Sequence, residues 1–261
     1  MDEAVLAHAL AAAREAAAAA GDIIRHHWQR GVQIELKDDQ TPVTVADREA
    51  ELAIRAILQR ALPEAGIYGE EFGRQGGSGR ALWLVDPLDG TKSFVRRTPF
   101  FSTQIALMLD GELVLGVSSA PIYGETMWAS RGQGAWLDGQ RVQVATTDSV
   151  AAASVSTGNI KSLATGRQWP LLGQLIGACN RIRGYGDFCH YHLLARGSLD
   201  LVIESDVGIL DIAALAVIVR EAGGLFTDLQ GAALDLDSRS VLAGTPALHG
   251  LALRQLQSGA G

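Results

Sequence analysis

Cysteine is scarce in this chain: its 261 residues include only two, Cys179 and Cys189. The two do not form a Cys-x-x-Cys arrangement, the spacing typical of redox and zinc sites. A disulfide between them is open, but nothing in the sequence requires one, and so few cysteines fit a reducing compartment better. We therefore expect a cytoplasmic protein.

Long apolar runs and basic blocks are also absent from the sequence. No stretch of about 18 or more apolar residues without a charge occurs, so we expect neither a membrane span nor a membrane partner. The Ala-rich start carries Asp2, Glu3, Arg14 and Glu15, an order unlike that of a secretory signal peptide. With 29 acids against 22 bases and no Lys/Arg block, nucleic acid is not an expected partner either.

Hydrophobic residues make up 48% and charged residues 20% of the chain, an ordinary globular balance that excludes intrinsic disorder. A chain of this length forms one large domain or two closely packed halves. The pattern of secondary-structure signals changes near residue 150. We expect an N-terminal half over 1–148 and a C-terminal half over 149–261.

Two helices are expected at the start of the N-terminal half. Residues 3–29 are rich in Ala, and Thr44 can cap a second helix that has Asp47 at its third position. Further on, 74–80 contains no apolar residue and three glycines, which indicates a solvated loop. The apolar run 81–85 is typical of a strand buried on both faces.

Hairpin signals dominate the rest of the N-terminal half. Strand-like segments at 103–109 and 112–118 flank the Asp-Gly pair at 110–111, and a second pair of strands flanks the Asp-Gly pair at 138–139. We therefore expect a mostly antiparallel sheet that is covered by the two opening helices.

Strands alternate with helices in the C-terminal half, which predicts an α/β arrangement there. The expected strands are 152–156, 181–184 and 199–204, and the expected helices lie around 171–178, 193–194 and 212–222. The last of these is predicted to be the final helix, stopped by Gly223 and Gly224.

Two acids follow the buried strand of the N-terminal half. The strand is expected to end at Asp86, and Asp89 comes three residues later across a tight turn. Asp-Pro and Asp-Gly are strong turn formers, so turn formation alone is one explanation. The other is a ligand site, because such sites in layered α/β folds lie at the ends of buried strands. Two ionised carboxylates there would repel each other unless a cation lay between them.

Other acids each have an ordinary explanation when they are taken singly. Glu70 and Glu71 fit a solvated surface. Asp211 fits the N-cap of the last apolar helix, and Asp47 fits a first-turn acid favoured by the helix dipole. Their combined order along the chain is harder to explain in this way.

Three segments carry these acids: Gly-Glu-Glu at 69–71, Asp-Pro-Leu-Asp-Gly-Thr at 86–91 and Asp-Ile-Ala-Ala at 211–214. Together they resemble the inositol monophosphatase-like superfamily of Mg²⁺-dependent phosphatases. The resemblance extends from about Lys37 to Gly224. It implies a layered αβαβα sandwich of the α+β or α/β class, a small phosphate ester as substrate and a homodimer.

The resemblance also implies a metal site with two or three Mg²⁺ ions. Glu70, Asp86 and the Leu88 carbonyl would hold one ion, and Asp86, Asp89 and Asp211 would hold a second. Oxygen ligands suit this hard cation, whereas Cys or His would not. Two such ions can clamp the attacking and leaving oxygens of an in-line displacement.

Catalytic and phosphate-binding roles come from the same resemblance. Asp47 and Thr91 match the pair that orients the attacking water, and Glu70 is counted with them as catalytic. The N–H groups of Gly90 and Thr91, at the start of a short helix, would hold phosphate oxygens. Lys37 matches a lysine near the metal site in several relatives, with a solvated loop lysine as the alternative.

Substrate signals favour the histidinol-phosphate phosphatase branch. Lys-Ser-Phe at 92–94 resembles that branch, and Asp187 is an acid where inositol-specific enzymes commonly have a small neutral residue. Glu204, seven residues before Asp211, matches a position that contacts the organic part of the substrate. The two acids would suit the ammonium and imidazole groups of L-histidinol phosphate, since charge-assisted hydrogen bonds are strong.

Alternatives to this prediction remain. Asp187 could simply cap the following helix, and Leu210 stands where many relatives have Trp, which alters the pocket wall. The roles of His190 and His192 are open. An inositol-1-phosphatase is the nearest rival function, followed by a 3′(2′),5′-bisphosphate nucleotidase. From another class, the chain could be a non-catalytic binding scaffold.

Overall fold

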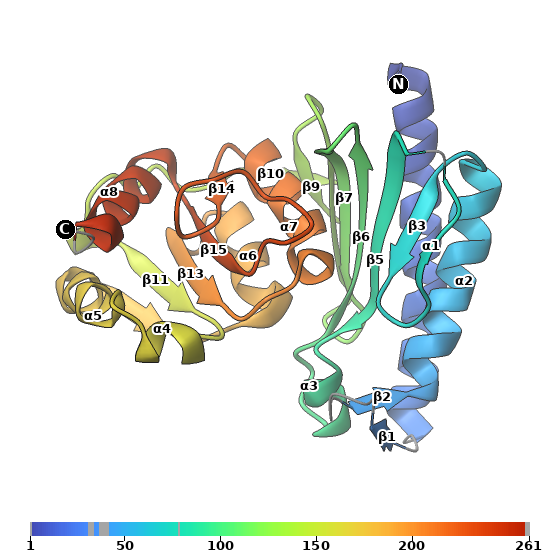
Figure 1. Cartoon of the computed structure of the whole chain (residues 1–261), viewed down its shortest axis with the longest axis horizontal. Coiled ribbons are helices and arrows are strands. Elements are labelled where there is room, and N and C mark those ends of the chain that lie inside the picture. The colour runs from blue at the N-terminus through green and yellow to red at the C-terminus, as the bar shows by residue number, and fades with distance from the viewer. Residues whose placement is uncertain (1, 31–33, 37–41, 78, 259–261) are drawn as a thin grey trace. The chain divides into compact units, whose positions relative to one another are not determined.

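The computed structural model of the chain describes residues 2–30, 34–36, 42–77 and 79–258, of which 34–36 and 42–43 are described by their backbone alone (Figure 1). Lys37, expected near the metal site, lies outside the described residues. The chain divides into two compact units, 1–140 with 210–218 and 141–209 with 219–261. The expected division into halves at residue 148 stays a prediction.

Two long helices cover one face of the sheet in the first unit. α1 (Glu3–Arg30) and α2 (Val45–Ala61) lie side by side (Figure 1). Both helices were expected from the sequence and are confirmed. The buried side of α1 consists largely of small side chains, which let the helix approach its neighbours closely. Ala9, Ala13, Ala16, Ala17 and Ala20 are fully buried there.

The start of α2 has the predicted capping box. Thr44 is the N-cap, and its side chain accepts a hydrogen bond from the Ala46 N–H at 3.2 Å. In return the Asp47 carboxylate accepts the Thr44 N–H at 2.8 Å. These bonds satisfy N–H groups that have no partner inside the helix, so the local sequence alone defines where α2 begins.

The first unit contains an eight-stranded sheet with the order β10-β9-β8-β7-β6-β5-β3-β4. β3 and β5 pair in parallel and the other described pairs are antiparallel, so a mostly antiparallel sheet is confirmed. The strands are β3 (Gly66–Gly69), β4 (Gly73–Gln75), β5 (Ala81–Asp89), β6 (Ser102–Leu109), β7 (Glu112–Ala120), β8 (Glu125–Ser130), β9 (Ala135–Leu137) and β10 (Gln140–Val142). β1 (Ile34–Leu36) and β2 (Pro42–Thr44) form a separate antiparallel pair.

Both predicted hairpin turns are confirmed. β6 and β7 are joined by Asp110 and Gly111, whose φ angles are 51° and 86°. β9 and β10 are joined by Asp138 and Gly139, with φ angles of 48° and 85°. A turn that matches the strand twist needs positive φ at both central residues, which Asp-Gly tolerates.

Two local predictions were wrong in this unit. Residues 74–75 belong to β4, which pairs with β3 at the edge of the sheet, so the solvated loop is shorter than predicted. An edge strand buries little, and hydrophobic patterning therefore does not reveal it. The strand expected to end at Asp86 also continues to Asp89, because the intervening residues form a bulge rather than a tight turn.

The first unit also includes part of a helix from the second half of the chain. α7 (Ile209–Glu221) contributes residues 210–218 to it. Leu115 and Val117 of β7 belong to the core formed with α1 and α2, and Gly116 between them points to the opposite face. There the helix backbone lies so close that a Cβ on Gly116 would be 2.3 Å from the Ala214 carbonyl oxygen.

The second unit is the expected α/β arrangement. Its five-stranded sheet has the order β12-β11-β13-β15-β14, in which β11 pairs in parallel with β12 and β13. The strands are β11 (Ser154–Thr157), β12 (Arg181–Arg183), β13 (Leu201–Ser205), β14 (Leu225–Thr227) and β15 (Ser240–Gly244). The helices are α4 (Lys161–Thr165), α5 (Trp169–Ala178), α6 (Asp187–Ala195) and α8 (Pro246–Gln257), with a 3₁₀ turn at Val150–Ala152.

The two faces of this second sheet differ in character. Val155, Leu201 and Ile203 pack with α4, α5 and α8 in one apolar core. The alternate side chains Ser156 and Glu204 point to the other face, where they contact α6. The prediction that α7 is the final helix was wrong, because β14, β15 and α8 follow it. Gly223 and Gly224 mark the end of α7, but they do not indicate whether further helices or strands follow.

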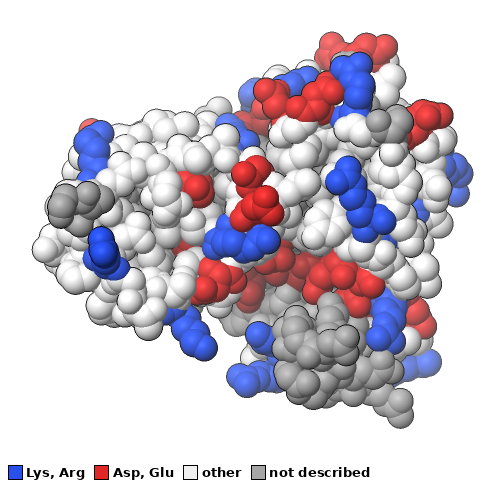
Figure 2. Space-filling model, in the orientation of Figure 1, with Lys and Arg blue, Asp and Glu red and all other residues white. Residues whose placement is uncertain are grey.

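The surface charges, the helices and the cysteines can be compared with what the sequence led us to expect. On the face shown in Figure 2, Lys and Arg side chains lie singly or in small groups among Asp and Glu side chains. Within the described residues, no helix combines the length and apolar composition needed to cross a membrane. Neither Cys179 nor Cys189 forms a disulfide.

We predict that Gly116→Ala destabilises the protein by about 1–3 kcal/mol, the usual cost of forcing an extra carbon into a close-packed contact. The added Cβ would have to displace α7 from β7, because the obstacle is backbone and not a flexible side chain. Urea unfolding followed by tryptophan fluorescence measures the change. Gly173→Ala in α5 is the matched control: it has open space around it and should be neutral or stabilise by up to about 1 kcal/mol. Equal stability of both variants would contradict the packing argument.

Candidate functional site

A bulge at the end of β5 brings two acids to the same side of the sheet. Residues three apart in a regular strand point to opposite faces. In β5, however, Asp86 pairs with Gln104 of β6 and Asp89 pairs with Ser102, so three steps on β5 match two on β6. The extra residue turns the Asp89 side chain to the Asp86 side.

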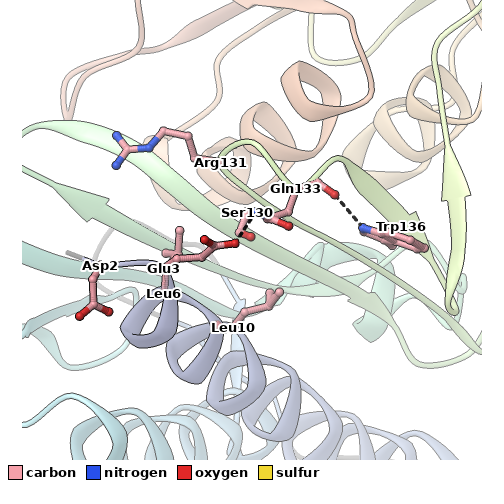
Figure 3. A pocket seen from close by; sticks show the side chains of 9 residues that line it. Asp2, Glu3, Leu6, Leu10, Ser130, Arg131, Gln133 and Trp136 are labelled. Carbon is pink, nitrogen blue, oxygen red and sulfur yellow. Dashed lines mark hydrogen bonds between the residues drawn. The ribbon is translucent and has the colours of Figure 1, made fainter.

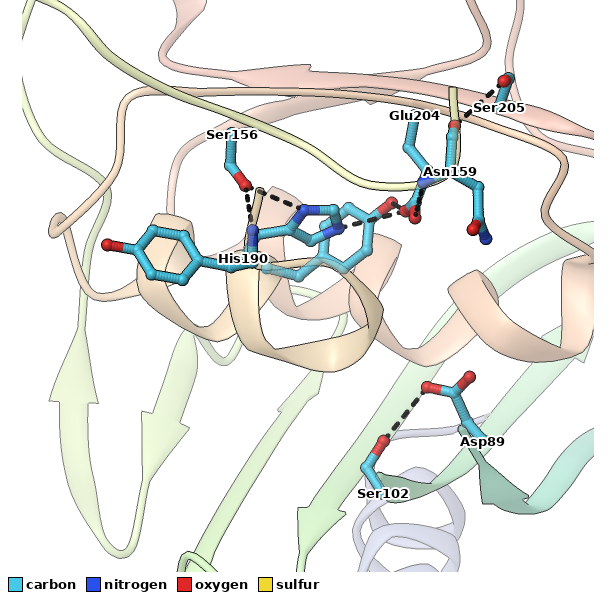
Figure 4. Close-up of polar contacts among 9 residues, drawn as sticks. Asp89, Ser102, Ser156, Asn159, His190, Glu204 and Ser205 are labelled. Atoms are coloured by element: carbon cyan, nitrogen blue, oxygen red, sulfur yellow. Dashed lines mark hydrogen bonds and ion pairs between the residues drawn. The ribbon is translucent and has the colours of Figure 1, made fainter. Parts of the chain in front are cut away.

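Polar bonds hold this bulge in place. The Leu88 N–H donates to the Asp86 carboxylate at 2.9 Å, and the Thr103 hydroxyl donates to the Pro87 carbonyl at 2.9 Å. On the neighbouring strand, the Ser102 hydroxyl lies 3.3 Å from the Asp89 carboxylate, and Figure 4 shows this contact. The direction of both carboxylates is therefore determined by the backbone and by buried neighbours.

A third acid joins them from α7. Carboxylate oxygens of Asp86, Asp89 and Asp211 lie within 4.8 Å of one another. Asp211 is in the first turn of α7, as expected, but is the third helical residue and not the N-cap. The positive end of the helix dipole favours a carboxylate at this position. Residues 125 positions apart in the sequence thus converge within the first unit.

The cluster has a large electrostatic cost when no cation is present. Burial raises the pKa of Asp86 well above its usual value, and the nearby charges of Glu70, Asp89 and Asp211 raise it further. Asp86 itself is only 3% exposed. A divalent cation would offset this repulsion, and a set of oxygen donors alone suits a hard ion such as Mg²⁺. The residues present therefore fit the metal that the sequence predicted.

Glu70 approaches the cluster from the neighbouring strand. It follows β3, which runs parallel to β5, and its N–H donates to the Val85 carbonyl at 3.1 Å. The carboxyl groups of Glu70 and Asp86 are close enough for a hydrogen bond between them, which contributes to the raised pKa of Asp86. Four predicted metal ligands thus contribute side chains to one region of the first unit.

Asp47 and Thr91 also meet, as the sequence predicted for the water-orienting pair. The Thr91 hydroxyl lies 2.9 Å from the Asp47 carboxylate and 3.0 Å from the Leu88 carbonyl. Burial raises the pKa of Asp47, although hydrogen bonds from Thr44 and Thr91 partly offset the effect. The N-terminus of α2 is thereby linked to the segment that follows β5.

Gly90 is required by the protein's own backbone. It is the N-cap of the short helix α3 (Thr91–Val95) and has a φ of 90°, a backbone conformation that residues with a Cβ rarely adopt. A Cβ there would lie 2.5 Å from the Phe100 carbonyl oxygen. The Gly90 N–H is expected to hold a phosphate oxygen, and the fold requires a glycine here for a separate reason.

The predicted substrate acid Glu204 lies in the second unit within a buried polar network (Figure 4). Its carboxylate accepts hydrogen bonds from the Tyr191 hydroxyl at 2.6 Å and the Asn159 N–H at 3.1 Å, and pairs with His190 Nε2 at 3.1 Å. Burial alone would raise the pKa of Glu204, but these partners together lower it. His190 Nδ1 lies 3.3 Å from the Ser156 hydroxyl.

Sequence reasoning left the role of His190 open, and the structure shows it fully buried between Ser156 and Glu204. One signal was available: Asp187 and His190 are three apart, a spacing that places them on one side of a helix. His192 is also buried and its ring meets that of Phe188 edge-on, at 5.0 Å between centroids.

Asp187 does not cap α6, the alternative that the sequence left open. The N-cap is Gly186, without a side-chain cap bond, and Asp187 is the first helical residue with a φ of 45°. Burial, and after it the charge of Glu204, raises the pKa of Asp187 to about 6, against a lowering effect of His190. Among the described residues, none donates a hydrogen bond to this carboxylate, so it is available to a ligand.

A separate cavity of about 500 Å³ lies at the start of α1, next to β8 and β9 (Figure 3). Asp2, Glu3 and Arg131 contribute charges to its lining, and Leu6 and Trp136 contribute apolar surface. None of the predicted site residues lines it.

Comparison with known proteins agrees with this geometry. Residues 6–260 match the inositol monophosphatase family. The chain is 40% identical over 233 residues to the histidinol-phosphatase of Mycobacterium tuberculosis, covering 87% of this chain and 89% of that protein. It is 38% identical over 246 residues to the histidinol-phosphatase of Streptomyces coelicolor, covering 88% of each.

Among solved structures, the extragenic suppressor protein suhB from Bartonella henselae superposes with a TM-score of 0.87 at 31% identity, over 95% of this chain and 98% of that one. The fold and the carboxylate cluster define a metal-dependent phosphomonoesterase. The chain belongs to the inositol monophosphatase family. The predicted family and fold class are confirmed.

We predict that Asp89→Asn makes the metal-free protein more stable while it abolishes stabilisation by Mg²⁺. Removal of one like charge from the cluster should add about 1 kcal/mol, or about 2–4 °C in Tm, whereas Mg²⁺ should raise the Tm of the unaltered protein only. Thermal unfolding with and without Mg²⁺ measures both effects.

Release of phosphate from a generic ester, assayed in parallel, should also disappear in Asp89→Asn. The exposed Asp148→Asn is the control and should behave as the unaltered protein does. Mg²⁺ stabilisation that survives in Asp89→Asn would remove Asp89 from the metal site. An unaltered protein without phosphatase activity would favour the non-catalytic scaffold.

Proposed function

We propose that this protein is an Mg²⁺-dependent phosphatase that hydrolyses L-histidinol phosphate to L-histidinol in histidine biosynthesis. The observation that carries the proposal concerns the Asp187 carboxyl group. It accepts no hydrogen bond from any described residue, and a second acid, Glu204, lies near it in the same unit. Its ligand is then expected to be a cation, such as the ammonium group of histidinol. Two relatives named histidinol-phosphatase, 40% and 38% identical, support the same substrate.

The metal ligands are proposed as the sequence predicted them. Glu70, Asp86 and the Leu88 carbonyl would hold one Mg²⁺, and Asp86, Asp89 and Asp211 a second; two or three ions in all are proposed from the resemblance. When bound, these ions would activate water and neutralise charge on the phosphate. The raised pKa of Asp86 supports this assignment, because it reflects a negative charge that a cation would stabilise.

The residues of the chain itself would position the reactants. Asp47 and Thr91 would accept a proton and orient the attacking water, and the 2.9 Å between Asp47 Oδ1 and the Thr91 hydroxyl supports this proposal. The N–H groups of Gly90 and Thr91 are proposed to bind phosphate oxygens. Such positioning supplies most of the catalysis in phosphoryl transfer.

Asp187 and Glu204 are proposed to select the substrate, but the support for them differs. Asp187 is half-buried and its carboxylate has no donor among the described residues. Glu204 is 2% exposed and already accepts bonds from Tyr191 and Asn159. A homodimer stays a prediction from the resemblance, and a cytoplasmic location stays a prediction from the small number of cysteines.

The test compares kcat/KM on L-histidinol phosphate, inositol 1-phosphate and adenosine 3′,5′-bisphosphate. We expect L-histidinol phosphate to be preferred.

Asp187→Asn tests the role of the carboxylate. Asn keeps the shape of the Asp side chain and, like Asp, tolerates the left-handed backbone of this position, whereas Asp187→Ala also adds strain. Loss of a charge-assisted bond should lower kcat/KM on histidinol phosphate about 10-fold to 100-fold in Asp187→Asn. The value for inositol 1-phosphate should change little. Equal losses on both substrates, or a preference for inositol 1-phosphate, would contradict the proposal.

The pH dependence offers a second test. Because the pKa of Asp187 is raised to about 6, the carboxylate is ionised above that pH and loses its charge below it. The preference for histidinol phosphate over inositol 1-phosphate should therefore fall as the pH drops through 6. The ratio of the two kcat/KM values cancels titration of the phosphate and of the metal site.

Asp187→Asn is the control for this pH profile, because it retains every titrating group except Asp187, the substrate's imidazole included. A ratio that changes with pH identically in both proteins would show that Asp187 does not contribute.

A further inference from the structure

A buried ion pair on α2 lies outside the residues assigned to the reaction. Glu51 and Arg55 are one helical turn apart, and Arg55 Nε is 2.7 Å from the Glu51 carboxylate. The side chain of Glu51 is fully buried and that of Arg55 is 9% exposed. Buried charges are costly unless all their bonding positions are used, so the partners of this pair are informative.

Those partners are the backbone groups that directly follow Glu70. The Glu51 carboxylate accepts the Glu71 N–H at 2.7 Å and the Phe72 N–H at 3.3 Å. Arg55 donates to the Gly73 carbonyl at 2.6 Å. The two side chains therefore bind the backbone of three successive residues, from the turn after β3 to the first residue of β4.

Contacts before and beyond this turn complete the arrangement. A Cβ on Gly69 would lie 2.0 Å from the Glu51 carboxylate and 2.9 Å from the Arg55 guanidinium, so only glycine lets the pair approach here. Arg55 also donates to the Gln75 side chain at 3.3 Å in β4. The pair thus contacts the chain on both sides of Glu70.

We propose that Glu51 and Arg55 are positioning residues that fix the backbone from 69 to 73 so that the Glu70 carboxylate faces Asp86. This inference rests on the proposed function, in which Glu70 is a metal ligand. Glu70 follows the end of β3 and precedes a turn. Without these bonds, motion of the turn would change the direction of the Glu70 carboxylate relative to Asp86. The ion pair limits this motion, since each of its bonds to the turn is charge-assisted and comes from a buried charged side chain.

Glu51→Gln tests the proposal. Glutamine has one acceptor oxygen where glutamate has two, so one of the donors from Arg55 or Glu71 must face an NH₂ group. We expect the affinity for Mg²⁺, measured by calorimetric titration of the metal-free protein with Mg²⁺ alone, to fall at least ~10-fold. Amide hydrogen exchange at Glu71 and Phe72 should become faster. Glu15→Gln, in an exposed ion pair with Arg60, is the matched control and should change neither.

Arg55→Lys is the second variant if Glu51→Gln folds poorly. Lysine keeps the charge near Glu51 but cannot also reach the Gly73 carbonyl and Gln75 in the fork geometry of arginine. We expect a smaller loss of Mg²⁺ affinity and faster exchange. Thermal unfolding of the metal-free variants checks that they are folded.

A double-mutant cycle separates positioning of Glu70 from a general loss of order. If Glu51 acts through Glu70, then Glu51→Gln should have little further effect on Mg²⁺ affinity in a Glu70→Gln background. Additive losses, or folded Glu51→Gln and Arg55→Lys proteins that bind Mg²⁺ normally, would overturn the proposal. Failure of the unaltered protein to bind Mg²⁺, or a Glu70→Gln protein with normal affinity, would instead refute the proposed metal site.

Discussion

The convergence of like-charged carboxylates at the end of β5 is the constraint on which the rest of the first unit depends. Asp86, Asp89 and Asp211 come from two distant parts of the chain and their oxygens lie within 4.8 Å. They repel one another, so the fold must hold them by other means. The bulge in β5 aims two of them, and the close contact of α7 with Gly116 brings the third. Such a cluster lowers stability in order to bind a cation, as functional sites often do.

The two units carry different parts of the proposed chemistry. The first unit holds the proposed metal ligands and the Asp47–Thr91 pair, which would act on the phosphate that every substrate of this kind shares. The second unit holds Asp187 beside the buried pair of His190 and Glu204, and Asp187 is proposed to recognise the organic part of the substrate. Under this proposal, the shared reaction and the choice of ester would depend on different residues, as expected when function resides in sites that a common fold presents.

Local signals predicted much of the fold and of the candidate site. The capping box of Thr44 and Asp47 and the two Asp-Gly turns each depend on a few neighbouring residues, and all are confirmed. The acids of the metal centre were identified because their spacing resembles that of a family. Weakly patterned elements were not: β4 is a short polar edge strand, and β14 has only three residues. The helix α8 was missed although Thr245 as N-cap and Pro246 after it are local signals of a helix start.

The amino-acid sequence by itself determined where α2 begins and where two hairpins turn, because these follow from interactions among near neighbours. It also marked the acids that are candidates for a metal centre, through the resemblance of their spacing to that of a family. Only the tertiary structure decided that Asp86 and Asp89 share one side of β5, that His190 pairs with Glu204, and that Glu51 binds the turn after Glu70. Each of these depends on groups that are close in space and distant along the chain. Their energies come from burial and from strand register, which no local pattern encodes.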